Sequence, residues 1–267
     1  MTTLADPSAE ARRIVEAGDA AGLPIRVVGG VGIALIAPTV GQLRPIRAYH
    51  DIDLAAPARA PAIARLMAAL GYGASTGFNA LNGAERMLFH DPGGRRIDVF
   101  IAMLRMCHEL PFGKRLTTWP LTLSAADLLL SKLQIVEFTD RDAQDVLALL
   151  ADHGLSESDN EGIDLRRIRD VCGRDWGWWR TVDDNLARLI PRWEAAAGTG
   201  AAGAAGAAAA GGEGAAAGAP PEASSRAVER ARDLRADLAA APKSAGWRLR
   251  AVVGPRLRWY ETPEEVR

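Results

Sequence analysis

The sequence has little cysteine, no excess charge of one sign and no long apolar run. Its two cysteines, Cys107 and Cys172, have neither metal-ligand nor disulfide-framework spacing, which predicts free thiols in a reducing cytoplasm. A formal net charge of -1 excludes a global electrostatic argument for nucleic-acid binding. Any partner therefore has to be recognised by a local group of residues.

Signals for export, membrane insertion and zinc binding are also lacking. The first residues, MTTLADPSAEARRIVEAGDAAG, are acidic where a signal peptide needs a basic end and an apolar block. The longest apolar run, VVGGVGIALIAP, is too short to cross a bilayer. The histidines show no mutual ligand spacing: His50, His90, His108 and His153. We expect a cytoplasmic protein without a membrane partner.

Composition divides the chain near residue 195. The stretch from Glu194 to Ser225 is almost entirely alanine and glycine, and it lacks the side chains that build a core. We expect a flexible or partly helical linker over residues 195–225. It separates an α/β domain (1–123) and a helical region packed on it (124–194) from a C-terminal basic and aromatic tail with helical character (226–267).

Periodicity before the linker alternates between helix and strand. It predicts a helix over 9–21, a strand entering a helix through glycines over 25–37, a strand ended by Pro57 and a helix ended by Gly71. Two strands around a turn follow over 85–102. Ser124 and Asp127 are typical of a capping box for a helix over 125–138, and a second helix covers 140–154. The pattern indicates an α/β fold.

Carboxylates stand inside the predicted strand YHDIDLAAP. Because alternate residues of a strand point to opposite faces, Asp51 and Asp53 project to one side while Ile52 and Leu54 project to the other. Two neighbouring carboxylates are costly to keep ionised without a cation. They are therefore either a solvated strand end or a metal site.

A third aspartate and a glycine pair extend this pattern. In RRIDVFI, Asp98 points away from the apolar set formed by Ile97, Val99 and Ile101. Gly29 and Gly30 fall where a strand turns into a helix, a place that favours phosphate, although a tight turn explains them equally well. Their spacing fits neither a Walker A loop nor a dinucleotide-binding fingerprint.

These residues resemble the motifs of the polymerase-β-like nucleotidyltransferase superfamily: a Gly-Gly turn, a D-x-D strand and a third strand aspartate. The stretch GGVGIAL followed by RPIRAYHDIDL is most similar to aminoglycoside 2''-nucleotidyltransferases and AbiEii-type toxins of toxin-antitoxin systems. The resemblance covers roughly residues 20–150. It extends to a lysine on one helix and an R-D-x-x-D segment on the next, places held by Lys132, Arg141, Asp142 and Asp145.

The resemblance implies a mixed sheet with flanking helices and a catalytic site for nucleotidyl transfer. It implies two Mg²⁺ ions on Asp51, Asp53 and Asp98, of which Asp98 either completes the second metal site or takes the acceptor's proton. It also implies a nucleoside triphosphate, which donates its monophosphate and is held by Gly29, Gly30 and Lys132. The acceptor is left open between tRNA, an aminoglycoside-like small molecule and a protein.

Two further segments have alternative interpretations. Lys132 lies in the apolar stretch LLLSKLQIV, where its ammonium binds a triphosphate, extends to the surface or pairs with a nearby aspartate. The tail GWRLRAVVGPRLRWYETPEEV mixes tryptophan and tyrosine with arginine, which suits either nucleic-acid binding or docking back on the catalytic half. We favour docking.

Two hypotheses compete with the enzyme. One is a catalytically silent nucleotidyltransferase-like module that binds a nucleotide or a partner. Retention of all three aspartates disfavours it, because binding alone gives no reason to keep clustered carboxylates. The other is a nucleic-acid adaptor built on the tail, which the near-zero net charge disfavours.

Overall fold

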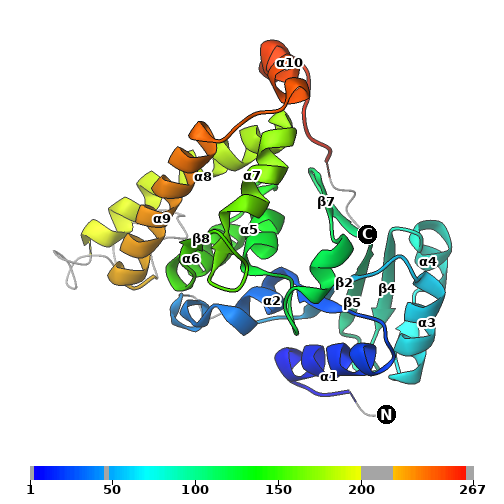
Figure 1. The fold of residues 1–267 in the computed structure, drawn as a ribbon. Helices are drawn as coiled ribbons and strands as arrows, with labels where there is room; N and C mark the ends of the chain where they lie inside the picture. Colours follow the sequence, from blue (N-terminus) through cyan, green and yellow to red (C-terminus); the bar gives the residue numbers. More distant parts are fainter. Residues whose placement is uncertain (1–2, 45–47, 200–218, 263–267) are drawn as a thin grey trace. The chain divides into compact units, whose positions relative to one another are not determined.

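The computed structural model describes residues 3–44, 48–199 and 219–262 (Figure 1). They form two compact units. The first contains the chain up to Leu35 together with Ala48–Arg105 and Glu109–Ser124. The second contains Ile36–Arg47, Met106–His108 and the chain from Ala125 onward.

The first unit is built on a five-stranded mixed sheet with the strand order β1-β2-β5-β4-β3. β2 and β5 are parallel, whereas the β1–β2, β4–β5 and β3–β4 pairs are antiparallel. A small hairpin is formed by β6 and β7. In chain order the elements are α1 (Pro7–Ala20), β1 (Arg26–Val28), α2 (Gly29–Ile36), β2 (Asp51–Ala56), α3 (Ala60–Ala69), β3 (Gly73–Ala74), α4 (Thr76–Asn82), β4 (Arg86–His90), β5 (Arg96–Ile101), β6 (Met103–Arg105), β7 (Glu109–Pro111) and the 3-10 turn η2 (Gly113–Thr117).

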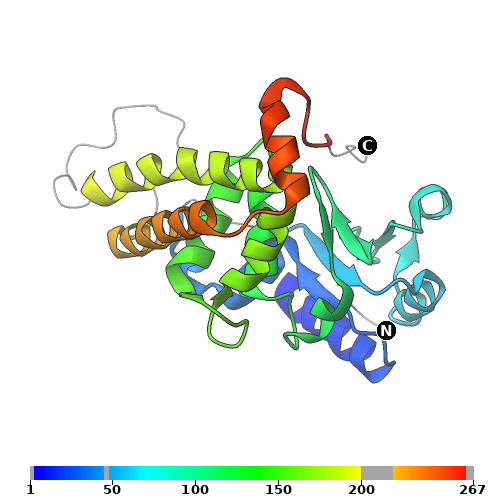
Figure 2. The same ribbon diagram turned by 45° about the horizontal axis from the view of Figure 1, so that its top comes forward.

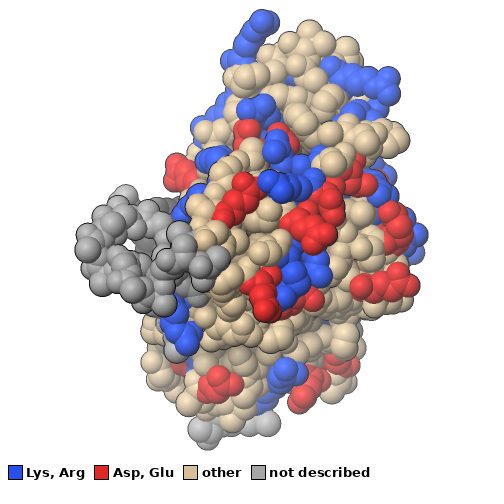
Figure 3. Space-filling view, turned by 90° about the vertical axis from the view of Figure 1, so that its left-hand side faces the viewer, with Lys and Arg blue, Asp and Glu red and all other residues tan. Residues whose placement is uncertain are grey.

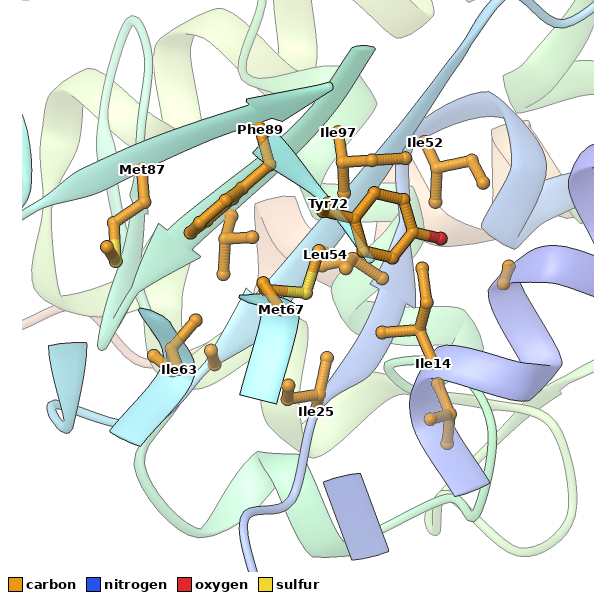
Figure 4. Close-up of a cluster of buried hydrophobic side chains, with 14 of the residues drawn as sticks. Ile14, Ile25, Ile52, Leu54, Ile63, Met67, Tyr72, Met87, Phe89 and Ile97 are labelled. Atoms are coloured by element: carbon orange, nitrogen blue, oxygen red, sulfur yellow. The ribbon is translucent and has the colours of Figure 1, made fainter. Parts of the chain in front are cut away.

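Helices α1 and α3 cover one face of this sheet and close the apolar core of the first unit (Figure 4). Ile52 of β2 and Ile97 of β5 point into the core, where they meet Ile14 of α1 and Met67 of α3, and all four are fully buried. Since side chains alternate along a strand, burial of Ile52 and Ile97 sends the intervening polar residues to the opposite face. The sheet therefore has an apolar face and a polar face.

The second unit is mainly helical (Figures 1 and 2). Its two long helices, α8 and α9, pack against each other and lie beside α6 and α7 in both views. In chain order the elements are η1 (Pro38–Gln42), α5 (Ala125–Leu133), α6 (Asp140–Asp152), β8 (Leu155–Ser156), β9 (Ile163–Asp164), α7 (Leu165–Arg174), α8 (Trp176–Thr199), α9 (Pro221–Ala240), α10 (Ala245–Val253) and η3 (Gly254–Arg256). The mixed α/β class with a helical C-terminal half is thus confirmed.

Helix boundaries in the second unit differ from the sequence-based ones for local reasons. α5 ends at Leu133, before the expected Phe138, and Thr139, with an extended backbone, caps α6 through a capping box with Asp142. α8 continues to Thr199 and α9 begins at Pro221, so both ends of the expected 195–225 linker are helical. Residues 200–218 of that linker lie outside the described residues.

The C-terminal tail packs on the helical unit, which corrects the expectation that it docks on the catalytic half. Trp247 of α10 meets Trp179 edge to face at 5.3 Å, and Trp259 meets Trp176 at 5.7 Å. Trp259 also donates its indole N–H to Thr181 Oγ1 at 3.1 Å. The tail docks here because α8 supplies the aromatic partners that its tryptophans need.

Both cysteines are free and buried, as expected. Burial raises the pKa of the Cys172 thiol to about 12, so it stays protonated at neutral pH. In the part of the chain that the structure describes, every helix is too short or too polar to cross a bilayer.

Candidate functional site

The polar face of the sheet in the first unit brings the three predicted aspartates together. β2 and β5 pair in parallel with Asp53 opposite Asp98 and Asp51 opposite Arg96. Neighbouring strands lie about 4.8 Å apart, so the Asp53 and Asp98 side chains start from adjacent points on one face. Asp51 is exposed, Asp53 is half-buried and Asp98 is only 2 % exposed. The register therefore places all three carboxylates on the same face of the sheet.

Two arginines hold the Asp98 carboxylate. Arg96, two residues earlier on β5, donates from Nε to Oδ2 at 2.6 Å, and Arg86 of β4 donates from Nε to Oδ1 at 2.8 Å. The guanidinium of Arg86 also lies over the Phe100 ring, 5.0 Å from its centroid. The hydrogen bond to Asp98 raises the pKa of Arg96 above its ordinary value, and the charges of Asp53 and Asp51 add to the effect. Both oxygens of Asp98 are therefore bound by cations of this chain.

Gly29 stands directly against Asp53. It opens α2 with a φ of +64°, a left-handed conformation that favours glycine. A β-carbon at this position would lie 2.2 Å from Asp53 Oδ2, closer than any van der Waals contact allows. Gly30 follows as the second residue of the helix. The turn between β1 and α2 is thus shaped to admit the Asp53 carboxylate.

The aspartates differ in how well they suit Mg²⁺. Asp51 and Asp53 offer hard oxygen donors from one face of one strand, and one or two carboxylates with substrate phosphates are enough to bind this ion. The carboxylate of Asp98 already contacts Arg86 and Arg96. Within residues 3–44, 48–199 and 219–262, no group of three or more His, Cys, Asp or Glu side chains is placed to hold a metal ion. A metal role for Asp51, Asp53 and Asp98 therefore stays a prediction.

Lys132 belongs to the second unit, where two aspartates bind it. Its Nζ lies 2.9 Å from Asp142 Oδ1 and 3.0 Å from Asp145 Oδ2, and the lysine side chain is 13 % exposed. Burial alone would lower the pKa of Lys132, but the two carboxylates more than offset this and raise it. Burial would likewise raise the pKa of Asp142, yet Lys132 and hydrogen bonds from Thr139 lower it.

This arrangement realises one of the alternatives left open for Lys132, pairing with nearby aspartates. Asp142 and Asp145 sit three residues apart on α6 and face α5 together. These ion pairs have a structural role, because they join α5 to α6 through the largely buried ammonium of Lys132. Binding of a triphosphate by Lys132 stays a prediction.

Sequence reasoning missed Arg86 and Arg96. The signal for Arg96 was present, since the spacing R-I-D on a strand puts Arg96 and Asp98 on the same face. Arg86 could be found only from the pairing of β4 with β5, in which Leu88 lies opposite Asp98 and Arg86 lies diagonally from it.

Known proteins offer little guidance for this site. No protein-family model matches the chain, and no curated protein matches it. Among solved structures, the chain is similar to the solution structure of the antibiotic-resistance factor ANT(2'')-Ia, an aminoglycoside nucleotidyltransferase. The identity is 16 % and the TM-score 0.34, over 52 % of this chain and 82 % of that one. At this TM-score the likeness says nothing about the chemistry of this chain.

Proposed function

We propose that this chain is a Mg²⁺-dependent nucleotidyltransferase that moves a nucleoside monophosphate from a nucleoside triphosphate to an acceptor. The observation that supports this is the register of the polar sheet face. It sets Asp53 beside Asp98 and leaves Asp51 exposed on the same face, while Gly29 opens a helix against Asp53. Carboxylates and the N-terminus of a helix thus meet at one place.

The chemistry of nucleotidyl transfer explains why these groups belong together. An acceptor hydroxyl attacks the α-phosphorus, its proton is removed and pyrophosphate leaves, so negative charge builds up on both sides of the phosphorus. Mg²⁺, when bound, neutralises this charge and polarises the phosphoryl oxygens. Asp51 and Asp53 are the residues that suit the metal. The backbone N–H groups of Gly29 and Gly30, in the first turn of α2, suit the outgoing phosphates.

Asp98 can act on the acceptor only after exchanging its partners. A carboxylate held by two guanidinium groups is a poor base and a poor metal ligand, because both oxygens are neutralised. Arg86 and Arg96 are 26 % and 34 % exposed, so each can turn toward a bound phosphate without unfolding the strand. In the proposed enzyme, the incoming triphosphate draws these arginines away from Asp98.

The contacts of Asp98 with Arg86 and Arg96 favour a second candidate function. If Arg86 and Arg96 never release Asp98, this carboxylate takes no part in binding a metal or in removing the acceptor's proton. The chain then acts as a catalytically silent module that binds a nucleotide or a partner through a nucleotidyltransferase-like face. The two candidates share nucleotide binding and differ in transfer.

Transfer is tested with purified protein, Mg²⁺ and each α-labelled nucleoside triphosphate, offered with tRNA, aminoglycosides or cell protein in turn. We expect label on one acceptor class. Asp51→Asn and Asp53→Asn, made separately, should abolish it, because the metal loses a charged ligand. Asp233→Asn, which changes an exposed carboxylate of α9, is the matched control and should transfer normally.

Melting curves accompany each variant, so a loss of transfer is separated from a loss of fold. Transfer by both Asp51→Asn and Asp53→Asn at the wild-type rate contradicts the assignment of the site. Nucleotide binding without transfer to any acceptor class favours the silent module instead.

A further inference from the structure

Helix α10 and the residues after it expose aliphatic side chains to an unusual degree. Leu249 is 73 % exposed, Val252 is 79 % exposed and Leu257 is 64 % exposed. Leu249 and Val252 are three residues apart, so they lie on the same face of α10. Neighbouring exposed aliphatic side chains of this kind are typical of an interaction surface.

The opposite face of α10 is anchored, which fixes the direction of the aliphatic face. Trp247 packs on Trp179, and the Arg250 guanidinium lies 4.8 Å from the centre of the Trp176 ring. The N-cap residue Ser244 accepts from the backbone N–H of Trp247 and donates its hydroxyl to the carbonyl of Arg174 at the end of α7. The helix therefore cannot roll over to bury Leu249 and Val252 in its own unit.

Positive charge predominates in the sequence around these aliphatic residues, although Asp175 lines a pocket with Arg250 and Glu261 follows Tyr260. Between residues 243 and 260 the sequence has no aspartate or glutamate and five cations: Lys243, Arg248, Arg250, Arg256 and Arg258. Within the described chain none of the five forms an ion pair with a carboxylate, whereas arginines elsewhere in the same unit do, as Arg169 does with Glu157 and Asp237. In Figure 3, acidic and basic side chains alternate over the middle of the visible face, but its top, at the height of α10 in Figure 1, shows basic and uncharged ones.

We propose that this C-terminal basic surface, made of α10 and residues 254–258, binds the surface of an anionic phospholipid membrane. Leu249, Val252 and Leu257 would enter the boundary between headgroups and acyl chains, while Arg248, Arg256 and Arg258 contact lipid phosphates. Such a helix lies on the bilayer and does not span it, and its binding would overturn our expectation of a protein without a membrane partner. The inference goes beyond the proposed transfer chemistry and does not depend on it.

Membrane binding suits the exposed side chains better than two other occupants. Single-stranded nucleic acid is bound by stacking on aromatic faces, but Trp247 and Trp259 are packed against α8 and the exposed residues are aliphatic. A second copy of this chain would bring the same five cations into contact, which like-charge repulsion opposes. An anionic bilayer offers phosphates and an apolar layer at the same surface.

The test is cosedimentation of the full chain with vesicles of phosphatidylcholine alone or mixed with phosphatidylglycerol. We expect binding to the mixed vesicles only, weakened by salt. Changing Arg248, Arg256 and Arg258 together to glutamine should lower the partition coefficient by about a hundredfold, since each cation near an anionic surface contributes roughly fivefold. Changing Leu249 and Val252 together to serine should lower it by about tenfold, because less apolar surface leaves water.

Matched controls come from the other unit. Leu81 of α4 is 87 % exposed and Arg65 of α3 is exposed, so Leu81→Ser and Arg65→Gln make the same chemical changes outside the proposed surface. Both should bind vesicles like the wild type, and melting curves verify that every variant is folded. Failure of the wild type to bind mixed vesicles overturns the proposal. Binding to single-stranded RNA in its place, lost with the arginines and unaffected by Leu249→Ser, would assign the surface to nucleic acid.

Discussion

Gly29 lies so close to the carboxylate of Asp53 that only a residue without a side chain fits at position 29. The Oδ2 atom of Asp53 lies 2.2 Å from the point where a β-carbon on residue 29 would stand. The glycine is therefore a partner of the aspartate as well as a turn residue, which links the β1–α2 turn to the polar face of β2.

Gly29→Ala should destabilise the fold more than a left-handed backbone alone explains. Gly22 is the matched control, because its φ is also +64° but a β-carbon there meets nothing within 4 Å. We expect Gly22→Ala to lower the free energy of unfolding by about 1 kcal/mol, from backbone strain. Gly29→Ala should lower it by about 3 kcal/mol, since the Asp53 carboxylate must also move. Urea unfolding measures both, and equal losses would refute the contact.

Replacement of Lys132 should show a pH-dependent loss of stability. Lys132→Met leaves Asp142 and Asp145 facing each other without a cation, which should cost about 3 kcal/mol near neutral pH. The pKa of Asp142 is lowered in the folded protein, so the ion pair's contribution is complete above the ordinary value of 3.8 and is lost as the pH falls through the lowered one. The difference in the free energy of unfolding between Lys132→Met and the wild type should therefore become smaller as the pH is lowered.

The control for this variant is Lys114→Met, which changes an exposed lysine and should shift stability by less than about 0.5 kcal/mol. If Lys132→Met lost little unfolding free energy at neutral pH, or lost more at acidic pH, the result would contradict a stabilising buried ion pair. Nucleotide affinity of the same variant tests the triphosphate role that the family resemblance gives to Lys132.

A second pH-dependent contribution comes from Glu10, whose side chain is fully buried in the first unit. Burial alone would raise the pKa of Glu10, but hydrogen bonds from Arg13, Tyr72 and the backbone of Leu4 lower it from 4.5 to about 2. The stability that this carboxylate contributes is complete above pH 4.5 and is lost as the pH falls to about 2.

Glu10→Gln should therefore lower the free energy of unfolding by about 3 kcal/mol at neutral pH, as the shift in pKa implies. The difference from wild type should close as the pH approaches the lowered pKa. Glu16→Gln, an exposed change on the same helix, should have little effect at any pH. If the difference in unfolding free energy between Glu10→Gln and the wild type did not change with pH, the packing of Glu10 and not its charge would determine how much it stabilises the fold. Urea unfolding across this pH range is the measurement.

The candidate site was visible in the sequence to the extent that neighbours along the chain determine it. Alternation along DIDLAA and RIDVFI placed Asp51, Asp53 and Asp98 opposite the apolar positions, and the structure agrees. The Gly-Gly turn into a helix was predicted for the same reason. A strand or helix repeats every few residues, so its faces depend on the local order of polar and apolar side chains.

Pairings between distant residues were decided by tertiary structure alone. Nothing in the sequence states that Asp53 lies opposite Asp98, that Arg86 reaches Asp98 from β4, or that the tail finds α8. Strand register and helix docking depend on which apolar surfaces fit together over the whole unit. A charged side chain meets its partner only after these surfaces have packed. For this reason the chain's composition and periodicity predicted its carboxylates, and only the fold showed which cations hold them.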